Sequence, residues 1–272
     1  MKEYLICIDS DGCAIDSMEI KHRRCFGPCM VDVWHLEPWR EEILNQWNEI
    51  NLYSMTRGIN RFLGLEKILT EIDGSYRKID GLDAYSAWCG TTSNFSNAAV
   101  EAEIRAGSHP IFSKVLEWSE YVNRSIAEIA PEVGPFPGVK EALQAMHGRA
   151  DIAIVSSANP QAVREEWTRF GFLEYVDYVM AQDAGTKADC IQRLRESGYP
   201  RDRILVLGDA PGDRSAAEQN GVLFYPILAG QEAASWELLV REALPGLFSG
   251  SYDPDYRQGL LDVFLRNLGG RS

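Results

Sequence analysis

The stretch YLICIDSDGCAIDS, residues 4–17, decides the fold, because an apolar run leads directly into closely spaced aspartates. The run YLICID is nearly continuous in apolar character, which is typical of a parallel strand that is covered on both faces. Asp9 and Asp11 are two residues apart, so their side chains point the same way while the chain stays extended. Two such charges repel each other, and folding alone gives no reason to place them together. The stretch therefore predicts a buried strand that ends at a reactive site.

Four more short apolar runs predict further strands. Helical patterns separate them, and one of these begins with Asn159 as the N-cap and Pro160 at the first helical position. Strand alternating with helix predicts an α/β fold, with a doubly wound, mostly parallel Rossmann-like sheet of about five strands. The four runs are DIAIVS (151–156), YVDYVM (175–180), ILVLGD (204–209) and VLFYPI (222–227).

A long helical insert separates the first strand from the second. It contains five of the seven tryptophans and a Gly/Ser/Asn-rich connection, WCGTTSNFSN (88–97). An aromatic stripe at helical spacing is more often core than ligand site, so we expect these tryptophans to form the interior of a second, helical domain. The three expected helices are EPWREEILNQWNEI, RGINRFLGLEKILTEI and SKVLEWSEYVNRSIAEIA, and the tryptophans stand at 34, 39, 47, 88 and 118.

The expected domain organisation follows from this insert. Residues 1–16 and 136–248 form the α/β core, and residues 17–135 form an α-helical cap domain. The Pro- and Gly-rich stretch PEVGPFPGVKEAL (131–143) predicts a hinge-like linker back to the core. Residues 249–272 form a tail in which RQGLLDVFLRNL predicts a terminal helix.

Composition excludes several classes of partner. The 272 residues are 45% hydrophobic and 25% charged, as is ordinary for a globular protein. The net charge of −13 argues against nucleic acid and against an anionic membrane surface, although acidity can also serve solubility alone. The first strand begins within three residues and no run of 18 apolar residues occurs, so we expect no signal peptide or membrane span and a cytoplasmic location. The six scattered cysteines predict reduced, partly buried thiols.

The fourth strand supplies two more carboxylates. LGDAPGD places Asp209 at the exit of the apolar run and Asp213 four residues later, across a Pro-Gly turn. Strand ends of an open α/β sheet face the crevice where ligands bind, so we expect these groups to meet Asp9 and Asp11. Four converging carboxylates need a cation, and Mg²⁺ prefers hard oxygen ligands. Of Asp9 and Asp11, one carboxylate can attack phosphorus while the other donates a proton to the departing oxygen.

Two further residues are candidates for holding a phosphoryl group. Ser156 ends the second strand just before a helix N-terminus, where its hydroxyl and nearby N–H groups can bind a phosphoryl oxygen, and Ser157 competes for that role. Lys187 stands at the start of the next helix as a point charge suited to phosphate. Taken alone, Lys187 also fits a solvated surface lysine.

Together these pieces resemble the haloacid dehalogenase (HAD) superfamily, in the form with a helical cap inserted after the first strand. The resemblance is carried, in order, by CIDSDGCAIDS, PFPGVKEAL, IVSSAN, GTK and LGDAPGD. It implies that Asp9 is the phosphoryl-accepting nucleophile and Asp11 the acid/base, with Ser156 and Lys187 as phosphate holders. It also implies that Mg²⁺ is the cofactor and is bound by Asp9, the backbone carbonyl of Asp11 and Asp209, with Asp213 assisting.

Within this superfamily the residues favour a phosphatase. An acid at position 11 suits phosphoryl transfer to or from oxygen, since dehalogenases and phosphonate-cleaving members lack it. A phosphomutase with the same motifs is the alternative within the enzymes, and a catalytically idle scaffold that binds a partner is the alternative outside them. KADC replaces the KPxP stretch of many relatives, and the insert is larger than a compact cap, so close relatives do not define the substrate.

The cap offers candidate contacts to a substrate, which we expect to be a small phosphorylated metabolite. TRGINR contains Arg57 and Arg61, two cations that could bind an anionic group, and His22 lies near the start of the cap. Both arginines also fit a solvated helix face, and His22 equally fits a structural hydrogen bond. The sequence gives no oligomeric state.

Overall fold

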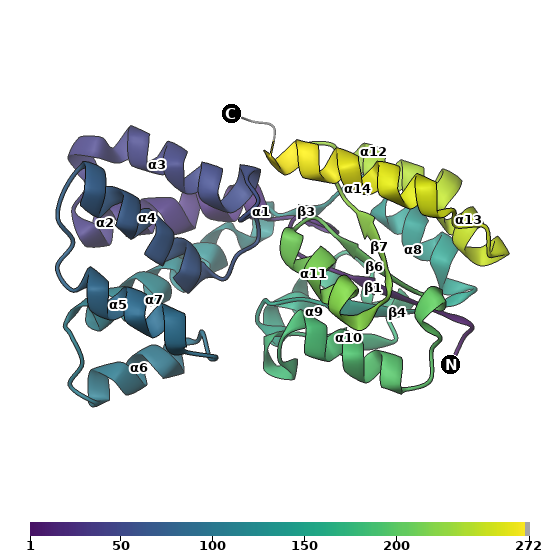
Figure 1. The fold of residues 1–272 in the computed structure, drawn as a ribbon, viewed down its shortest axis with the longest axis horizontal. Coiled ribbons are helices and arrows are strands. Elements are labelled where there is room, and N and C mark those ends of the chain that lie inside the picture. Colours follow the sequence, from purple (N-terminus) through teal and green to yellow (C-terminus); the bar gives the residue numbers. More distant parts are fainter. Residues whose placement is uncertain (270–272) are drawn as a thin grey trace. The chain divides into compact units, whose positions relative to one another are not determined.

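The computed structural model describes residues 1–269 and divides into two compact units (Figure 1). The first unit contains Met1–Met18 together with the chain from Gly134 onward, and the second unit is Glu19–Val133. A short helix, α1 (Met18–Lys21), spans the first boundary. The second unit is thus an insertion, because the chain leaves the first unit after one strand and later returns to it.

A five-stranded parallel sheet forms the centre of the first unit, with the strand order β5-β4-β1-β6-β7. The central strand β1 aligns Ile8 with Ile154 on one side and with Leu207 on the other. This arrangement confirms the predicted doubly wound α/β sheet. The strands are β1 (Tyr4–Ile8), β4 (Ala150–Val155), β5 (Tyr178–Met180), β6 (Ile204–Gly208) and β7 (Leu223–Pro226), and β2 (Ile15–Asp16) pairs separately with β3 (Gly134–Pro135).

Helices cover both faces of this sheet. Cys7, Ala153 and Val206 are aligned on the neighbouring strands β1, β4 and β6. They share one buried cluster with residues of α10 and α11, so these two helices cover one face. Helix α8 packs on β4 and against α12, while α14 packs on β7. The helices of this unit are α8 (Val139–His147), α9 (Pro160–Arg169), α10 (Lys187–Glu196), α11 (Pro211–Asn220), α12 (Glu232–Leu238), α13 (Leu244–Ser249) and α14 (Pro254–Gly269).

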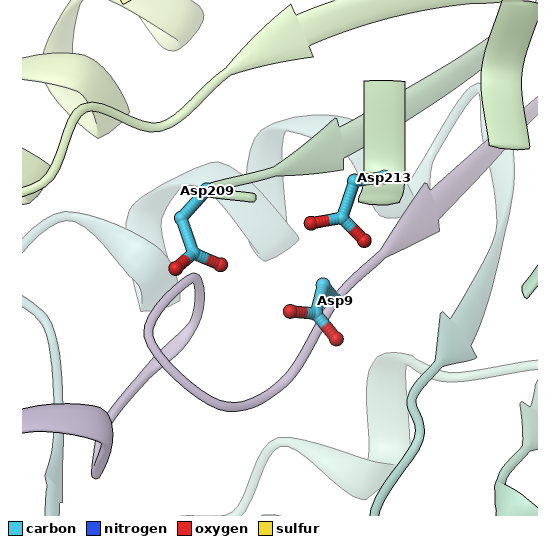
Figure 2. Close-up of side chains that lie close together, drawn as sticks. All are labelled: Asp9, Asp209 and Asp213. Atoms are coloured by element: carbon cyan, nitrogen blue, oxygen red, sulfur yellow. The ribbon is translucent and has the colours of Figure 1, made fainter. Parts of the chain in front are cut away.

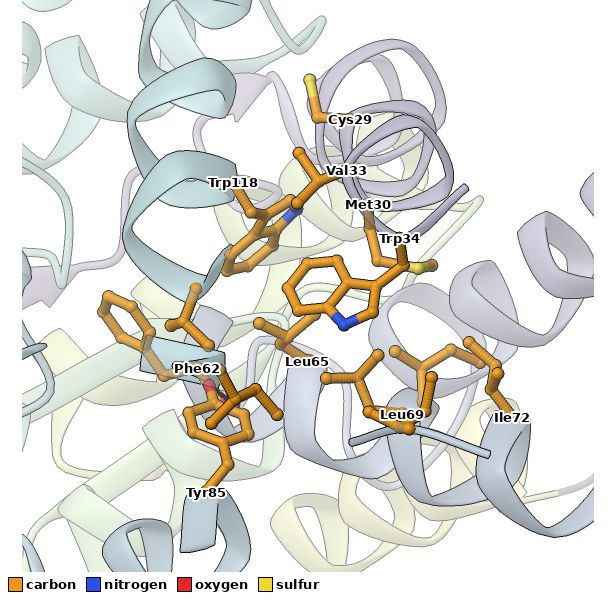
Figure 3. Close-up of a cluster of buried hydrophobic side chains, with 14 of the residues drawn as sticks. Cys29, Met30, Val33, Trp34, Phe62, Leu65, Leu69, Ile72, Tyr85 and Trp118 are labelled. Atoms are coloured by element: carbon orange, nitrogen blue, oxygen red, sulfur yellow. Dashed lines mark hydrogen bonds between the residues drawn. The ribbon is translucent and has the colours of Figure 1, made fainter. Parts of the chain in front are cut away.

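The second unit is helical and has its own aromatic core (Figure 3). Trp47 and Trp118 are fully buried at its centre, with Trp34 and Trp88 also buried and Trp39 packed against them. The interpretation of the tryptophans as the interior of a helical domain is therefore confirmed. Its helices are α2 (Gly27–Trp34), α3 (Arg40–Asn48), α4 (Arg61–Ser75), α5 (Leu82–Thr91), α6 (Asn97–Arg105) and α7 (Ile111–Ile129), with π-helical segments at His22–Phe26 and Glu49–Tyr53.

Three local predictions need correction. The expected connection at 88–97 is partly helical, because α5 continues to Thr91, and α6 starts at Asn97 under the Ser96 N-cap. The expected linker at 131–143 becomes helix α8 from Val139, where Gly138 takes the left-handed conformation (φ 89°). The terminal helix is confirmed but belongs to the first unit, since Phe264 and Leu268 are buried in a cluster with Ala229.

Each of the six cysteines carries a free thiol, and all but Cys89 are buried. Burial raises the pKa of Cys7 to about 12, so this thiol stays neutral. Within residues 1–269, no helix is both long and apolar enough to cross a membrane.

Candidate active site

Three aspartates lie at the carboxyl edge of the sheet. Asp9 directly follows β1, and Asp209 directly follows the neighbouring strand β6. Asp213 is in the first turn of α11, where its Oδ2 accepts the Ala210 N–H at 3.1 Å. The Asp9 N–H extends the sheet by donating to the Leu207 carbonyl at 3.0 Å. Parallel strands end at the same edge, so the sheet itself brings distant aspartates together.

These residues, Asp9, Asp209 and Asp213, form a buried carboxylate cluster (Figure 2). One carboxylate oxygen from each lies within 4.8 Å of the others. The three residues are only 6%, 1% and 1% exposed, respectively. Carboxylates are seldom buried this deeply unless a cation compensates them.

Lys187 supplies one positive charge to the cluster. Its Nζ lies 2.8 Å from Asp9 Oδ1 and 2.5 Å from Asp213 Oδ1, and its side chain is 18% exposed. The lysine is the first residue of α10, whose capping box of Thr186 and Asp189 fixes the start of the helix. A surface lysine is therefore the wrong interpretation, since Lys187 bridges the carboxylate that follows β1 and a carboxylate in the first turn of α11.

The charges of the cluster do not balance. Burial raises the pKa of Asp9 well above its usual range; Lys187 opposes this, and Asp213 and Asp209 add to it. Burial likewise raises the pKa of Asp213 against the effect of Lys187. Burial alone would lower the pKa of Lys187, but Asp213 and Asp9 outweigh it and hold the ammonium charged. One lysine facing three carboxylates leaves an excess of negative charge.

This donor set fits a hard divalent cation such as Mg²⁺. The cluster offers carboxylate oxygens alone, close enough to one another to share an ion. A divalent cation would also offset the negative charge of the neighbouring aspartates, which adds to burial in raising the pKa of Asp9 and Asp213.

Gly208 makes room for the cluster. A Cβ atom at this position would lie 2.3 Å from the Asp213 Cβ and 2.4 Å from its Cγ, both closer than real contacts allow. Gly208 is the last residue of β6, so the Asp213 side chain passes directly over the backbone that leads to Asp209. Only glycine fits there without moving a carboxylate.

Replacement of Gly208 by Ala should displace Asp213 and with it the Lys187 ion pair. We expect turnover to fall by about 10²-fold, because a misplacement of about 1 Å in a catalytic site has that effect. Steady-state kinetics and circular dichroism on the purified variant measure this. Gly212→Ala is the matched control, since a Cβ there meets nothing within 4 Å. Equal turnover in the two variants would contradict this role of Gly208.

Asp11 is not one of the three clustered carboxylates. It is half-buried, and its Oδ1 accepts a short hydrogen bond from the hydroxyl of the buried Ser17. Ser156 directly follows β4, the other neighbour of β1, so it ends at the same edge of the sheet as Asp9. Its Oγ accepts the Ala158 N–H at 3.1 Å, which leaves the O–H able to donate to a ligand. Ser157 is exposed.

The three candidate cap residues have partners within the second unit. Arg57 is 3% exposed and donates to the Leu52 carbonyl at 2.8 Å. Arg61 donates to Asn123 Oδ1 at 2.7 Å and lies 5.0 Å from the centre of the Phe26 ring. The His22 Nδ1 accepts the Trp47 indole N–H at 3.1 Å. Each contact stabilises the helical unit, and a role in substrate binding stays a prediction.

Four residues that shape the site were missed by sequence reasoning: Gly208, Ser17, Trp167 and Trp236. A glycine at the end of an apolar strand was a usable signal for Gly208, because it often marks a close approach of other atoms. Ser17 stood inside the first motif, but its bond to Asp11 depends on how the chain turns after β1.

The chain is similar to known proteins in sequence family and in fold. A family model described as haloacid dehalogenase-like hydrolase matches residues 85–227. A search of curated proteins found no match. A solved candidate phosphoglycolate phosphatase from Lactobacillus delbrueckii subsp. bulgaricus is similar in fold, with a TM-score of 0.55 and 16% identity over 89% of this chain and 92% of that one.

Two further solved structures are similar. A hydrolase from Pseudomonas syringae has a TM-score of 0.52 and 16% identity, covering 86% of this chain and 89% of its own. A candidate phosphoglycolate phosphatase from Lactobacillus plantarum has a TM-score of 0.50 and 12% identity, covering 86% of this chain and 91% of its own. At these identities the likeness establishes a shared fold alone.

Proposed function

The chain belongs to the haloacid dehalogenase-like hydrolase family, and from this we propose that it is a Mg²⁺-dependent phosphatase acting on a small phosphorylated metabolite. The observation that carries the proposal is the buried cluster of Asp9, Asp209 and Asp213 bridged by Lys187. Such a cluster is unfavourable for folding on its own, and it suits a phosphoryl group that arrives with a cation.

Asp9 is the nucleophile in this proposal. Its carboxylate oxygen forms a bond to phosphorus while the bond from phosphorus to the leaving oxygen breaks, which gives an aspartyl phosphate. Asp11 donates its proton to the leaving oxygen and then, as a carboxylate, accepts a proton from the water that attacks phosphorus. This second step releases inorganic phosphate and restores both aspartates. Asp11 follows Asp9 by two residues, so one loop carries both roles.

Lys187 and Ser156 hold the transferring group. The Lys187 ammonium, already 2.8 Å from Asp9, favours the ionised form of that carboxylate against the effect of burial and offsets the charge of the phosphoryl oxygens. Ser156 and the start of α9 add hydroxyl and N–H donors at the same sheet edge. Asp209 and Asp213, with Asp9 and the Asp11 carbonyl, would hold Mg²⁺, which when bound neutralises part of the phosphate charge.

The helical unit is proposed as the cap that recognises the leaving group. Its candidate contacts remain Arg57, Arg61 and His22. Phosphoglycolate is a reasonable first substrate to test, because two of the similar solved structures carry that activity in their names.

Release of inorganic phosphate from a panel of small phosphomonoesters tests the function. We expect release with Mg²⁺, none with EDTA, and recovery when Mg²⁺ is added back in excess. Release that continues unchanged in EDTA contradicts the metal dependence. A folded protein that binds Mg²⁺ yet releases no phosphate from any ester of the panel contradicts the phosphatase proposal.

A further inference from the structure

Two buried tryptophans donate hydrogen bonds to the loop that carries the proposed nucleophile and acid. Trp167, on α9, is fully buried, and its Nε1 donates to Ser10 Oγ at 2.9 Å. Trp236, on α12, is also fully buried, and its Nε1 donates to the Cys13 carbonyl at 2.9 Å. The bonds join residues that are 157 and 223 positions apart in the chain. The two accepting residues stand on either side of Asp11.

The loop has a fixed shape of its own. Gly12 takes the left-handed conformation (φ 79°), and its N–H donates to the Ile15 carbonyl at 2.9 Å. The Ser10 carbonyl accepts from Ala14 and Ile15 at 3.0 and 2.9 Å. These bonds define the turn but do not place it in the unit. The two indole bonds do, and so do the Phe136 N–H, which donates to the Ala14 carbonyl at 3.0 Å, the Asp9 N–H bond to Leu207, and the pairing of β2 with β3.

The packing around Trp236 requires a glycine at position 138. A Cβ on Gly138 would lie 3.0 Å from the Trp236 Cβ, and Gly138 has φ 89°. Gly138 is the N-cap residue of α8, where the chain has just returned from the helical unit.

We propose that Trp167 and Trp236, named here the anchoring tryptophans, are positioning residues for Asp9 and Asp11. This inference rests on the proposed phosphatase function. A buried indole N–H needs an acceptor, so packing alone explains that each has one. It does not explain why both acceptors lie within the four residues that follow Asp9. Loss of either bond frees the loop to move, and small displacements of reacting groups reduce turnover strongly.

The test uses Trp167→Phe and Trp236→Phe in the full chain, because phenylalanine keeps an aromatic ring and removes the N–H. Hydrogen exchange of the amides of residues 9–15 is measured first, since it does not depend on any activity. We expect about tenfold faster exchange there, with unchanged exchange in β4 and β6. Loop exchange equal to that of the unaltered protein in both variants overturns the proposal.

Kinetics on the best phosphate ester supply the second readout. We expect kcat to fall by roughly tenfold to 10²-fold while KM changes little, as for a lost transition-state interaction. A fall that only matches the fraction of unfolded protein, measured by urea titration, overturns the positioning role. Ser10→Ala is the partner variant for Trp167. If the indole acts through Ser10, the double variant is no slower than Trp167→Phe alone.

The two readouts separate failure of this inference from failure of the proposed function. Faster loop exchange in a protein that releases no phosphate from any ester supports the anchoring and rejects the phosphatase. Normal loop exchange together with Mg²⁺-dependent phosphate release rejects the anchoring and leaves the phosphatase standing.

Discussion

Replacement of Asp9 by Asn lowers kcat by at least about 10⁴-fold, because a neutral amide cannot attack phosphorus as the carboxylate does. The fold is retained, since the substitution is nearly isosteric and removes a charge from a cluster that already has too many of one sign. Phosphate release under saturating substrate and Mg²⁺ measures the loss, and circular dichroism confirms the fold.

The control for this prediction is Asp202→Asn. Asp202 is exposed and lies just before β6, at the opposite end of that strand from Asp209. Turnover in this variant should equal that of the unaltered protein. Appreciable turnover in Asp9→Asn, with deamidation back to Asp excluded by mass spectrometry, contradicts a covalent mechanism on Asp9.

Replacement of Lys187 by Met should lower both the free energy of unfolding and the turnover, with an effect on turnover second only to that of Asp9→Asn. It leaves Asp9 and Asp213 buried without the ammonium that lies 2.8 and 2.5 Å from them. Breaking a buried ion pair in this way lowers the free energy of unfolding by about 3–5 kcal/mol. Mg²⁺ should restore part of this loss, because it binds the folded carboxylate cluster and not the unfolded chain.

Urea unfolding in EDTA and in Mg²⁺ measures the stability of the Lys187→Met variant, and phosphate release measures its turnover, which we expect to fall by about 10²-fold or more. Lys140→Met is the control, because Lys140 is an exposed residue of α8. Equal stability of the two variants in EDTA would mean that the cluster does not depend on Lys187.

The sequence predicted the sheet well because parallel strands leave a strong local signal. The central strands β1 and β6 are buried at every position and so read as unbroken apolar runs. The same reasoning located Asp9 and Asp209, since residues that follow neighbouring parallel strands end at one edge. Strand position therefore predicts which carboxylates meet, without any knowledge of the distances between them.

Other features of the site depend on packing that no local pattern encodes. Lys187 was placed at the site only by the family resemblance; taken alone it resembled a surface lysine, because nothing near it in the sequence shows that α10 begins beside the carboxylate cluster. Gly208 is required by the path of a side chain five residues later. The anchoring tryptophans meet their acceptors across more than half the chain, so propensity and periodicity carry no trace of either bond.

In the helical unit, too, some features were predicted from the sequence and others were missed. Its tryptophans were correctly assigned to a core, because large apolar residues at helical spacing have few other places to go. Helices α5 and α6 were missed because Gly90 and the Ser/Asn-rich segment between the two helices look like a loop, although α6 itself is rich in Ala and Glu, which favour a helix. Packing of Tyr85 and Trp88 against the aromatic core stabilises α5 despite its weak helical sequence.

The most direct test of the account is to trap the phosphorylated residue during turnover. The protein is mixed with the best ester of the panel and Mg²⁺, quenched in acid and reduced with borohydride, which converts an aspartyl phosphate to homoserine. Peptide mass spectrometry then locates the change. A covalent mechanism on Asp9 predicts homoserine at residue 9 in the unaltered protein, and none in a sample incubated without ester. Rapid phosphate release with residue 9 unchanged and homoserine at another aspartate would contradict it.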